Sequence, residues 1–312
     1  MASTDTQDMP LTTINSTSSL PLTSKNEDKE ENYSIILLAI YSVVLVTGII
    51  SLSLMMHILK SSSTSITSIA VLNLIFAHFI FLITVPFRIY YYATEHWHLG
   101  LGMCKMISGM IHIHMYMSFI FYVIILITRL MAFYRKDEQL ASFQRIHALL
   151  FSAVVWIVVL VMVPCIIHFS YGKHNEKNNS TLTDKVCFKF GSSIEDKAKV
   201  VNYIISTLII VVATVLTVLQ ANVLWVLYRK HRQGCTSQQD FGAQLKSLCF
   251  ALIMVVCFIP YHMFRFYYVE HPKLENINEV FLSLTTFNCL DMLTFLGRRS
   301  CYMSVFGKIF CL

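Results

Sequence analysis

Three basic side chains have the chemistry and the spacing to bind an anion. His262 and Arg265 are three residues apart, so on a helix they share one face. Arg88 follows Pro86 by two residues, near the end of a long apolar run. A guanidinium group binds a phosphate or a carboxylate through two parallel hydrogen bonds. The alternative, if these runs cross a membrane, is that Arg88 and Arg265 only extend to the membrane interface.

Other chemistries are not supported by the residue pattern. A metal-dependent intramembrane enzyme would need a set such as His-Glu-x-x-His, or paired aspartates, and the sequence has no such set. His112 and His114 are two residues apart, so on a helix they point to different faces, which argues against a shared metal ion. We therefore expect no enzyme activity, no metal ion and no cofactor.

Composition places these residues in a membrane protein. Of the 312 residues, 55% are hydrophobic and 13% are charged, and the mean hydropathy is +0.61. A soluble domain carries about 25% charged residues. The net charge of +6 is too small to indicate nucleic-acid binding. No internal repeat is visible, which weighs against a transporter built from duplicated halves.

Seven apolar segments are each long enough to cross a bilayer as a helix. They are about Ile35–Met56, Ile66–Tyr92, Met103–Tyr134, Ile146–Phe169, Val200–Leu227, Leu245–Tyr268 and Val280–Leu296. Cys104 and Arg129 are 25 residues apart on the third segment, which is about 37 Å along a helix. Since a hydrocarbon core is about 30 Å thick, the two side chains should lie at opposite membrane faces. We predict an all-α bundle of seven transmembrane helices over residues 35–297.

We expect a multi-pass protein of the plasma membrane with its N-terminus outside the cell. Lysines and arginines divide equally between the two sides, so the positive-inside rule does not decide the orientation. Overlapping glycosylation sequons at Asn178 and Asn179 fall in the loop after the fourth segment, which is extracellular only in this orientation. Residues 1–34 are polar, contain a sequon at Asn15 and show no cleavable signal peptide, so we expect an extracellular disordered segment.

Two of the nine cysteines are placed to form a disulfide. Cys104 begins the third segment, and Cys187 lies in the outer loop after the fourth, so both would face an oxidising compartment. A disulfide would hold this loop over the third helix. The alternative is two free thiols.

The C-terminal residues 298–312 form a tail on the inner side of the membrane in this topology. Arginines and a lysine alternate there with aromatic and aliphatic residues, which indicates a short amphipathic helix on the membrane surface, in contact with lipid headgroups. Cys301 and Cys311 are candidate palmitoylation sites, and unmodified cysteine is the alternative.

A resemblance rests on residues at fixed places in these segments. They are Cys104 and Arg129 at the two ends of the third, Trp156 in the fourth, Pro260 in the sixth and Asp291 in the seventh. With the run Cys257–His262, they make residues 35–310 resemble a rhodopsin-like G-protein-coupled receptor. The resemblance implies a receptor that passes the signal of an extracellular ligand to a heterotrimeric G protein. Further runs, including His112–Tyr116, are similar to the branch near purinergic and lipid receptors.

The triplet around the third segment's arginine departs from the family pattern. The resemblance implies an acidic residue before the arginine, but the chain reads Thr128-Arg129-Leu130. Asp240 lies 20 residues before Pro260, about 30 Å down the sixth helix, where several family members place an acidic partner. We therefore predict an Arg129–Asp240 pair in the resting state. The alternative is an Arg129 solvated beside lipid headgroups.

A second departure lies in the middle of the membrane. The family carries an aspartate where this chain has His78, and an Asn/Asp-Pro-x-x-Tyr motif where it has Asp291. An imidazole is a poor partner for the sodium ion that the family holds there, so we expect sodium regulation to be lost. We predict that His78 hydrogen-bonds Asp291, and a simple core histidine is the alternative. Pro260 keeps a hinge in the sixth helix, whereas the seventh segment has no proline.

The ligand pocket implied by the resemblance opens outward between the second, third, fifth, sixth and seventh helices. Ile111 stands where the family's amine receptors carry an aspartate, which argues against an amine ligand. The His-x-x-Arg spacing resembles that of nucleotide and lipid-mediator receptors, so we expect an anionic lipid or a nucleotide-like ligand. The candidate ligand-binding residues are Arg88, His112, Tyr116, Tyr261, His262 and Arg265. The alternatives are a constitutively active or ligand-independent partner of another receptor and, with less support, a transporter.

Overall fold

The structure is a computed structural model that describes residues 22–59, 66–134, 141–170, 187–188, 196–232 and 238–292. These residues form seven α-helices and two 3-10 segments, with no strand among them. The α-helices are Leu22–Leu59 (α1), Ile66–Thr94 (α2), Gly100–Tyr134 (α3), Ala141–Ser170 (α4), Asp196–Arg232 (α5), Gln238–Glu270 (α6) and Glu275–Leu284 (α7), and the 3-10 segments are Pro272–Leu274 (η1) and Thr285–Met292 (η2). The predicted all-α fold is confirmed. The predicted sites outside the described residues are Asn15, Asn178, Asn179, Cys301, Cys311 and the tail 298–312.

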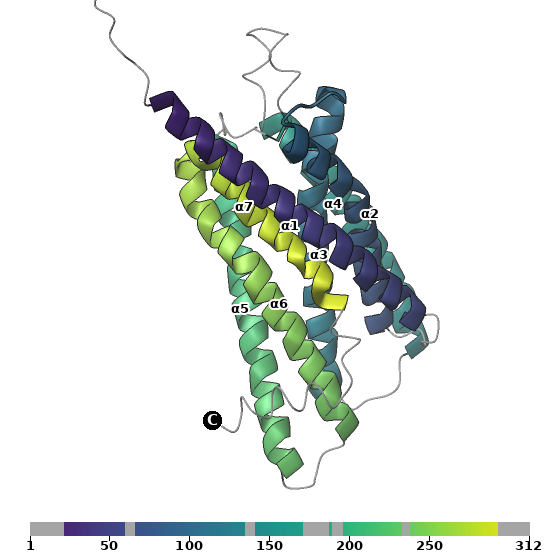
Figure 1. Cartoon of the computed structure of the whole chain (residues 1–312). Helices are drawn as coiled ribbons and strands as arrows, with labels where there is room; N and C mark the ends of the chain where they lie inside the picture. Colours follow the sequence, from purple (N-terminus) through teal and green to yellow (C-terminus); the bar gives the residue numbers. More distant parts are fainter. Residues whose placement is uncertain are drawn as a thin grey trace, which may run out of the picture.

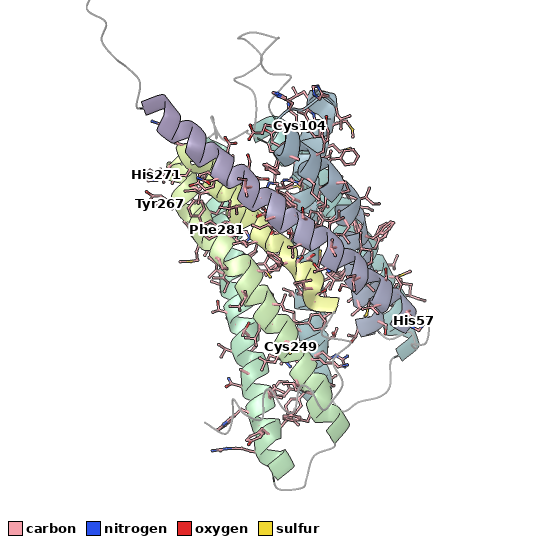
Figure 2. All side chains as sticks on the ribbon, viewed as in Figure 1. His57, Cys104, Cys249, Tyr267, His271 and Phe281 are labelled. Carbon is pink, nitrogen blue, oxygen red and sulfur yellow. A yellow bond between two sulfur atoms is a disulfide. The ribbon has the colours of Figure 1, made fainter. Side chains whose placement is uncertain are left out.

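Six of these helices, α1 to α6, are long and apolar enough to cross a bilayer. Large apolar side chains such as Val46, Ile204 and Val256 lie exposed on the outside of the bundle, where lipid would cover them. Figure 2 shows side chains projecting outward along the length of the helices, with Cys104 and His271 toward one end and Cys249 toward the other. The outer surface is therefore that of a protein dissolved in lipid rather than in water.

Helix α3 is the centre of the bundle, because it contacts α2, α4, α5, α6 and η2. Helix α1 crosses the outside of α2 and α7 (Figure 1). Helices α5 and α6 lie side by side and extend together beyond the end of η2 (Figure 1). Helices α4 and α5 contact each other only sparsely. This arrangement leaves space between α3, α4, α5 and α6 for the cavity described below.

Helix α1 begins at Leu22, inside the segment 1–34, and the expectation of an extracellular disordered N-terminus stays a prediction. The apolar span provides the helical nucleus, and extending an existing helix costs less than starting one, since each added residue gains a hydrogen bond. The stretch Lys25–Glu31 consists largely of lysine and glutamate, which are good helix formers. Only residues 1–21 of the predicted disordered segment lie outside the described residues.

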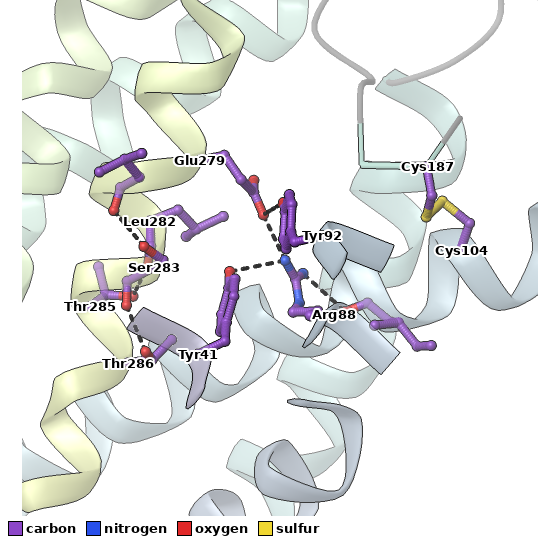
Figure 3. Close-up of polar contacts among 12 residues, drawn as sticks. Tyr41, Arg88, Tyr92, Cys104, Cys187, Glu279, Leu282, Ser283, Thr285 and Thr286 are labelled. Carbon is purple, nitrogen blue, oxygen red and sulfur yellow. Dashed lines mark hydrogen bonds and ion pairs between the residues drawn. A yellow bond between two sulfur atoms is a disulfide. The ribbon is translucent and has the colours of Figure 1, made fainter. Parts of the chain in front are cut away.

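The seventh helix begins at Glu275, five residues before the predicted start, and changes from α to 3-10 form at Thr285. The hydroxyl groups of Ser283, Thr285 and Thr286 donate to the carbonyl oxygens three residues earlier, at 2.7, 2.6 and 2.6 Å; Figure 3 shows two of these bonds. Hydroxyls that bond the backbone in this way compete with the regular α-helical pattern. Since the segment contains no proline, we attribute its tightening to these hydroxyls.

Small and polar residues decide how the first four helices approach one another. Gly48 of α1 faces Leu82 of α2 so closely that a Cβ at this glycine would lie 2.8 Å from a Leu82 methyl group. Trp156 of α4 donates from its indole Nε1 to Asn73 Oδ1 at 2.9 Å, and Asn73 Nδ2 donates to Ser152 Oγ at 3.1 Å. The tryptophan on which the family resemblance rests is thus the partner of an asparagine on α2.

Replacing Asn73 by leucine should destabilise the bundle, because it removes both side-chain hydrogen bonds between α2 and α4. Such bonds in membrane proteins contribute about 0.6 kcal/mol each on average and up to about 1.7 kcal/mol. We expect a stability loss of about 1–3 kcal/mol, measured as a lower melting temperature of the purified protein in detergent. Leu72→Ala, at an exposed position on the same helix, is the control. Equal melting temperatures for the wild type and Asn73→Leu would contradict this role.

Candidate functional site

A disulfide and an aromatic cluster close one end of the bundle. Cys104 of α3 is bonded to Cys187, with a Cα–Cα distance of 5.7 Å, which confirms the predicted pair (Figure 3). The next residue, Phe188, has a φ of +66°, a backbone conformation that is rare for residues other than glycine. Its ring centroid lies 5.1 Å from that of Tyr91 and 5.8 Å from that of Trp97. The disulfide therefore anchors a buried aromatic side chain over the helix ends.

A cavity of about 840 Å³, counting its mouth, lies below this cluster. Residues of α3, α4, α5, α6 and α7, together with Phe188, line it. The pocket predicted from the sequence lies between the second, third, fifth, sixth and seventh helices. In the structure α4, and not α2, contributes to the lining. The α2 side is closed because Arg88 of α2 is engaged by Glu279 and packs 4.4 Å from the Phe188 ring. On the opposite side, Val163 and Ile166 of α4 form part of the wall.

Four of the six predicted ligand-binding residues line the cavity, namely His112, Tyr116, Tyr261 and Arg265. His262 does not. It is buried, and its Nδ1 lies 3.1 Å from the hydroxyl oxygen of Ser206 on α5. Positions three apart on a helix share a broad face but differ in direction by about 60°, so His262 faces α5 while Arg265 reaches the cavity.

Arg265 is held in place by two amide groups. Its Nε donates to Asn202 Oδ1 on α5 at 3.1 Å, and its Nη1 donates to Asn278 Oδ1 on α7 at 3.2 Å. The guanidinium carbon also lies 5.0 Å from the centre of the Tyr268 ring. Both amides line the cavity as well. A rigidly held guanidinium is thus presented where a ligand could reach it.

Arg88 is engaged by the protein itself, and the expectation that it binds a ligand stays a prediction. Its Nη1 donates to Glu279 Oε1 at 2.6 Å and to the Tyr41 hydroxyl at 3.1 Å (Figure 3). Its Nη2 donates to the Ile107 carbonyl oxygen at 3.2 Å. The Arg88 side chain is fully buried. A buried arginine needs a counter-charge, and Glu279 of α7 supplies it.

The acidic side of the cavity was missed by sequence reasoning. Glu275 and Glu279, one turn apart on α7, both belong to its lining. In the sequence they precede the predicted seventh span, Val280–Leu296. Both are ionisable residues at the edge of an apolar segment, and such a residue requires a partner inside the bundle. This is the sequence signal that indicates them.

The predicted mid-membrane pair is present as part of a larger cluster. His78 Nε2 lies 3.4 Å from both carboxylate oxygens of Asp291. The Tyr122 hydroxyl donates to Asp291 Oδ2 at 2.5 Å. On its other side, His78 Nδ1 lies 2.8 Å from His114 Nε2. All four side chains are buried, so this cluster joins α2, α3 and η2 in the interior. The loss of sodium regulation stays a prediction.

At the opposite end of the bundle, a pair of glutamines lies near the backbone of Arg129, and one of them contacts it. Gln220 Nε2 of α5 donates to Gln244 Oε1 of α6 at 2.6 Å, and Gln244 Nε2 lies 3.5 Å from the Arg129 carbonyl oxygen. Thr128 donates its hydroxyl to the Ile125 carbonyl oxygen at 2.9 Å, within its own helix. The sequence analysis does not predict these two glutamines. A polar amide within an apolar segment is nevertheless a sign of a contact between helices.

The proposed Arg129–Asp240 pair stays a prediction. Asp240 lies in the first turn of α6, but its side chain lies outside the described ones. Leu130, next to the arginine, is buried. Pro260 lies inside α6, two residues after Phe258, whose ring packs 5.7 Å from Phe119 and 6.1 Å from Tyr122. The proline therefore follows the aromatic contact between α6 and α3.

The Arg88–Glu279 pair yields a stability prediction. Arg88→Met leaves the partly buried carboxylate of Glu279 without its counter-charge, and we expect a loss of stability below the value of about 3–5 kcal/mol that is typical of fully buried pairs. The double variant Arg88→Met/Glu279→Gln removes both charges, so we expect it to melt at a higher temperature than Arg88→Met alone. Arg229→Met, at an exposed arginine of α5, is the control. Additive effects of the two substitutions would show that the pair is not coupled.

Comparison with known proteins agrees with this architecture. The family "7 transmembrane receptor (rhodopsin family)" matches residues 51–294. The chain is 37% identical to human "Probable G-protein coupled receptor 141", over 88% of this chain and 91% of that protein. It is 28% identical to human "Lysophosphatidic acid receptor 4", over 80% and 70% of the two chains, and 24% identical to "Probable G-protein coupled receptor 34" of Pan troglodytes, over 84% and 72%. The resemblance carried by Cys104, Arg129, Trp156, Pro260 and Asp291 is therefore confirmed, and this chain belongs to the rhodopsin family of seven-transmembrane receptors.

Proposed function

We propose that this protein is a plasma-membrane receptor, with its N-terminus outside the cell, for an amphiphilic ligand with an anionic head group. Binding at the Cys104 end would shift the bundle between two packings and so signal to a heterotrimeric G protein at the Arg129 end. The observation that carries the proposal is Arg265, a guanidinium held by Asn202 and Asn278 in the cavity lining.

The cavity wall suits the apolar part of such a ligand. Val163 and Ile166 of α4 and Ile205 of α5 line it on the side where these helices contact each other sparsely. Val201, also in the lining, is partly exposed on the outside of the bundle. An acyl chain could therefore lie against α4 and α5 while the head group meets Arg265. A relative named lysophosphatidic acid receptor supports the same ligand class.

The two glutamates refine the proposed head group. Glu279, which pairs with Arg88, and Glu275 both belong to the cavity lining. A head group that combines an anionic group with hydroxyl donors suits a lining that holds both a guanidinium and carboxylates. A nucleotide, with more negative charge and no acyl chain, fits this mixed lining less well.

The first test is a ligand screen read by G-protein dissociation in cells, with lysophosphatidic acid, fatty acids and nucleotides as probes. Arg265→Ala should raise the half-maximal concentration of an active lysophospholipid about 10–100-fold, because a hydrogen bond to a charged group contributes about 1.5–3 kcal/mol. Arg265→Lys should restore part of the response. Lys273→Ala, at an exposed lysine of η1, is the control. Equal responses of the wild type and Arg265→Ala would refute the proposed anion site.

A second candidate function, signalling without a ligand, is favoured by the residues around Arg129. Thr128 replaces the acidic neighbour and bonds only its own helix in the described contacts. One hydrogen bond from α6 to the end of α3 is long, at 3.5 Å from Gln244 Nε2 to the Arg129 carbonyl oxygen. A resting state restrained by such a weak bond would leave a populated active state.

Gln244→Ala should therefore raise ligand-free signalling. It removes the short bond to Gln220 and the contact to Arg129, and a loss of about 1 kcal/mol of restraint corresponds to about a fivefold shift in population. Basal G-protein dissociation is the measurement, with Asp240→Ala as a parallel test of the predicted ion pair. Val256→Ala, exposed on the same helix, is the control. If basal signalling of Gln244→Ala stays at the wild-type level, the amide contacts do not restrain the receptor.

A further inference from the structure

Three buried side chains from three different helices converge in the middle of the bundle. His78 comes from α2, His114 from α3 and Cys289 from η2, and one donor atom of each lies within 4.8 Å of the other two. At most 2% of each residue is exposed. We propose that these residues form a binding site for a zinc ion. The spacing of His112 and His114 argues against a metal ion shared by these two residues. The three ligands proposed here come from distant parts of the sequence.

The distances already approximate the first coordination shell of zinc. Zinc binds imidazole nitrogen at about 2.0–2.1 Å and thiolate sulfur at about 2.3 Å, so a tetrahedral site separates two nitrogens by about 3.3 Å and nitrogen from sulfur by about 3.6 Å. Cys289 Sγ lies 3.6 Å from His78 Nδ1 and 3.7 Å from His114 Nε2. The two nitrogens are 2.8 Å apart. Binding requires that the two imidazoles separate by about 0.5 Å. Because the two nitrogens share a hydrogen bond and both must present a lone pair to the metal, His114 must also carry its proton on Nδ1 in place of Nε2.

The surroundings of His78 match the usual second shell of a metal-bound histidine. Such a histidine donates its other ring N–H to a carboxylate, which fixes the tautomer and turns the free lone pair toward the metal. His78 Nε2 faces the Asp291 carboxylate at 3.4 Å, while its Nδ1 faces the other two ligands. Asp291 is itself held by the Tyr122 hydroxyl. The predicted His78–Asp291 pair is thus also a support for a metal ligand.

The charge of the site suits a divalent, borderline-soft ion. When zinc binds, the Cys289 thiol releases its proton and coordinates as thiolate. One thiolate and the Asp291 carboxylate together balance the two positive charges, so no net charge is left in the membrane interior. Two imidazoles and a thiolate are nitrogen and sulfur ligands, which suit zinc and do not suit sodium, magnesium or calcium.

A bound ion would join the three helices that the cluster already brings together. Cys289 lies in the 3-10 segment η2, and its carbonyl oxygen accepts a hydrogen bond from Ser51 of α1 at 3.1 Å. Zinc would therefore hold η2 against α2 and α3, at the point where the seventh helix lacks a proline. The ion would stabilise one packing of the bundle over others.

The test uses the full-length receptor purified in detergent without chelators. We expect about one zinc per receptor by elemental analysis, and a higher melting temperature after chelated receptor is refilled with Zn²⁺. Co²⁺ in place of zinc should give a thiolate-to-cobalt absorption band, which reports the sulfur ligand directly. The band is measured on the wild type, so the test stands even where a variant fails to fold.

Variants separate this site from other histidines and cysteines. Cys289→Ala should lose the cobalt band, and His114→Ala should lose the bound zinc. Asp291→Asn, which changes only the supporting carboxylate, should weaken zinc binding about 10–100-fold. Cys249→Ala on α6 and His57→Ala on α1 are matched controls that should behave as the wild type (Figure 2).

Two results would overturn the proposal. One is a wild-type receptor that carries no zinc as purified and whose melting temperature does not respond to Zn²⁺. The other is a zinc response or cobalt band that persists in Cys289→Ala and disappears in His57→Ala, which would assign the metal to the protein surface.

Discussion

The structure depends on one buried carboxylate. Asp291 is inaccessible to solvent in the middle of the bundle, where an unpartnered charge would cost several kcal/mol. Tyr122 of α3 donates to it, and His78 of α2 lies beside it. The Tyr122 ring also packs against Phe258 of α6. Asp291, a single side chain of η2, thereby fixes the relative positions of α2 and α3. Its partner Tyr122 also contacts α6, the helix that carries Pro260.

Buried polar groups also determine which helices pair toward both ends of the molecule. Apolar side chains alone do not specify how helices pair in a membrane, because lipid is as apolar as they are. Polar groups do, since each must find its partner on another helix. Arg88 finds Glu279 on α7 near the Cys104 end, and Gln220 of α5 finds Gln244 of α6 near Arg129. The bundle is therefore specified by a few polar contacts at different depths.

The seventh helix shows how a family feature can be replaced by different chemistry. Proline loosens a helix by removing a hydrogen bond. Here Thr285 and Thr286 redirect hydrogen bonding instead, by donating to the preceding turn, and the backbone adopts the tighter 3-10 form. A long run of 3-10 helix is less stable than a regular α-helix, because its hydrogen bonds have poorer geometry. The irregularity thus lies beside Asp291, where the polar cluster supports it.

Apolar length and local spacing are properties of the chain alone, and they predict the membrane class and the helical segments. The Cys104–Cys187 pair, 83 residues apart, is predicted by the topology, which places both cysteines on one side of the membrane. Two of the predicted boundaries, Ile66 and Tyr134, coincide with the start of α2 and the end of α3. The partners of buried polar groups become visible only when the helices are packed together. Glu279 lies 191 residues from Arg88, and no local pattern joins them. Spacing tells which residues share a helix face, but the rotation and neighbours of each helix are set by packing.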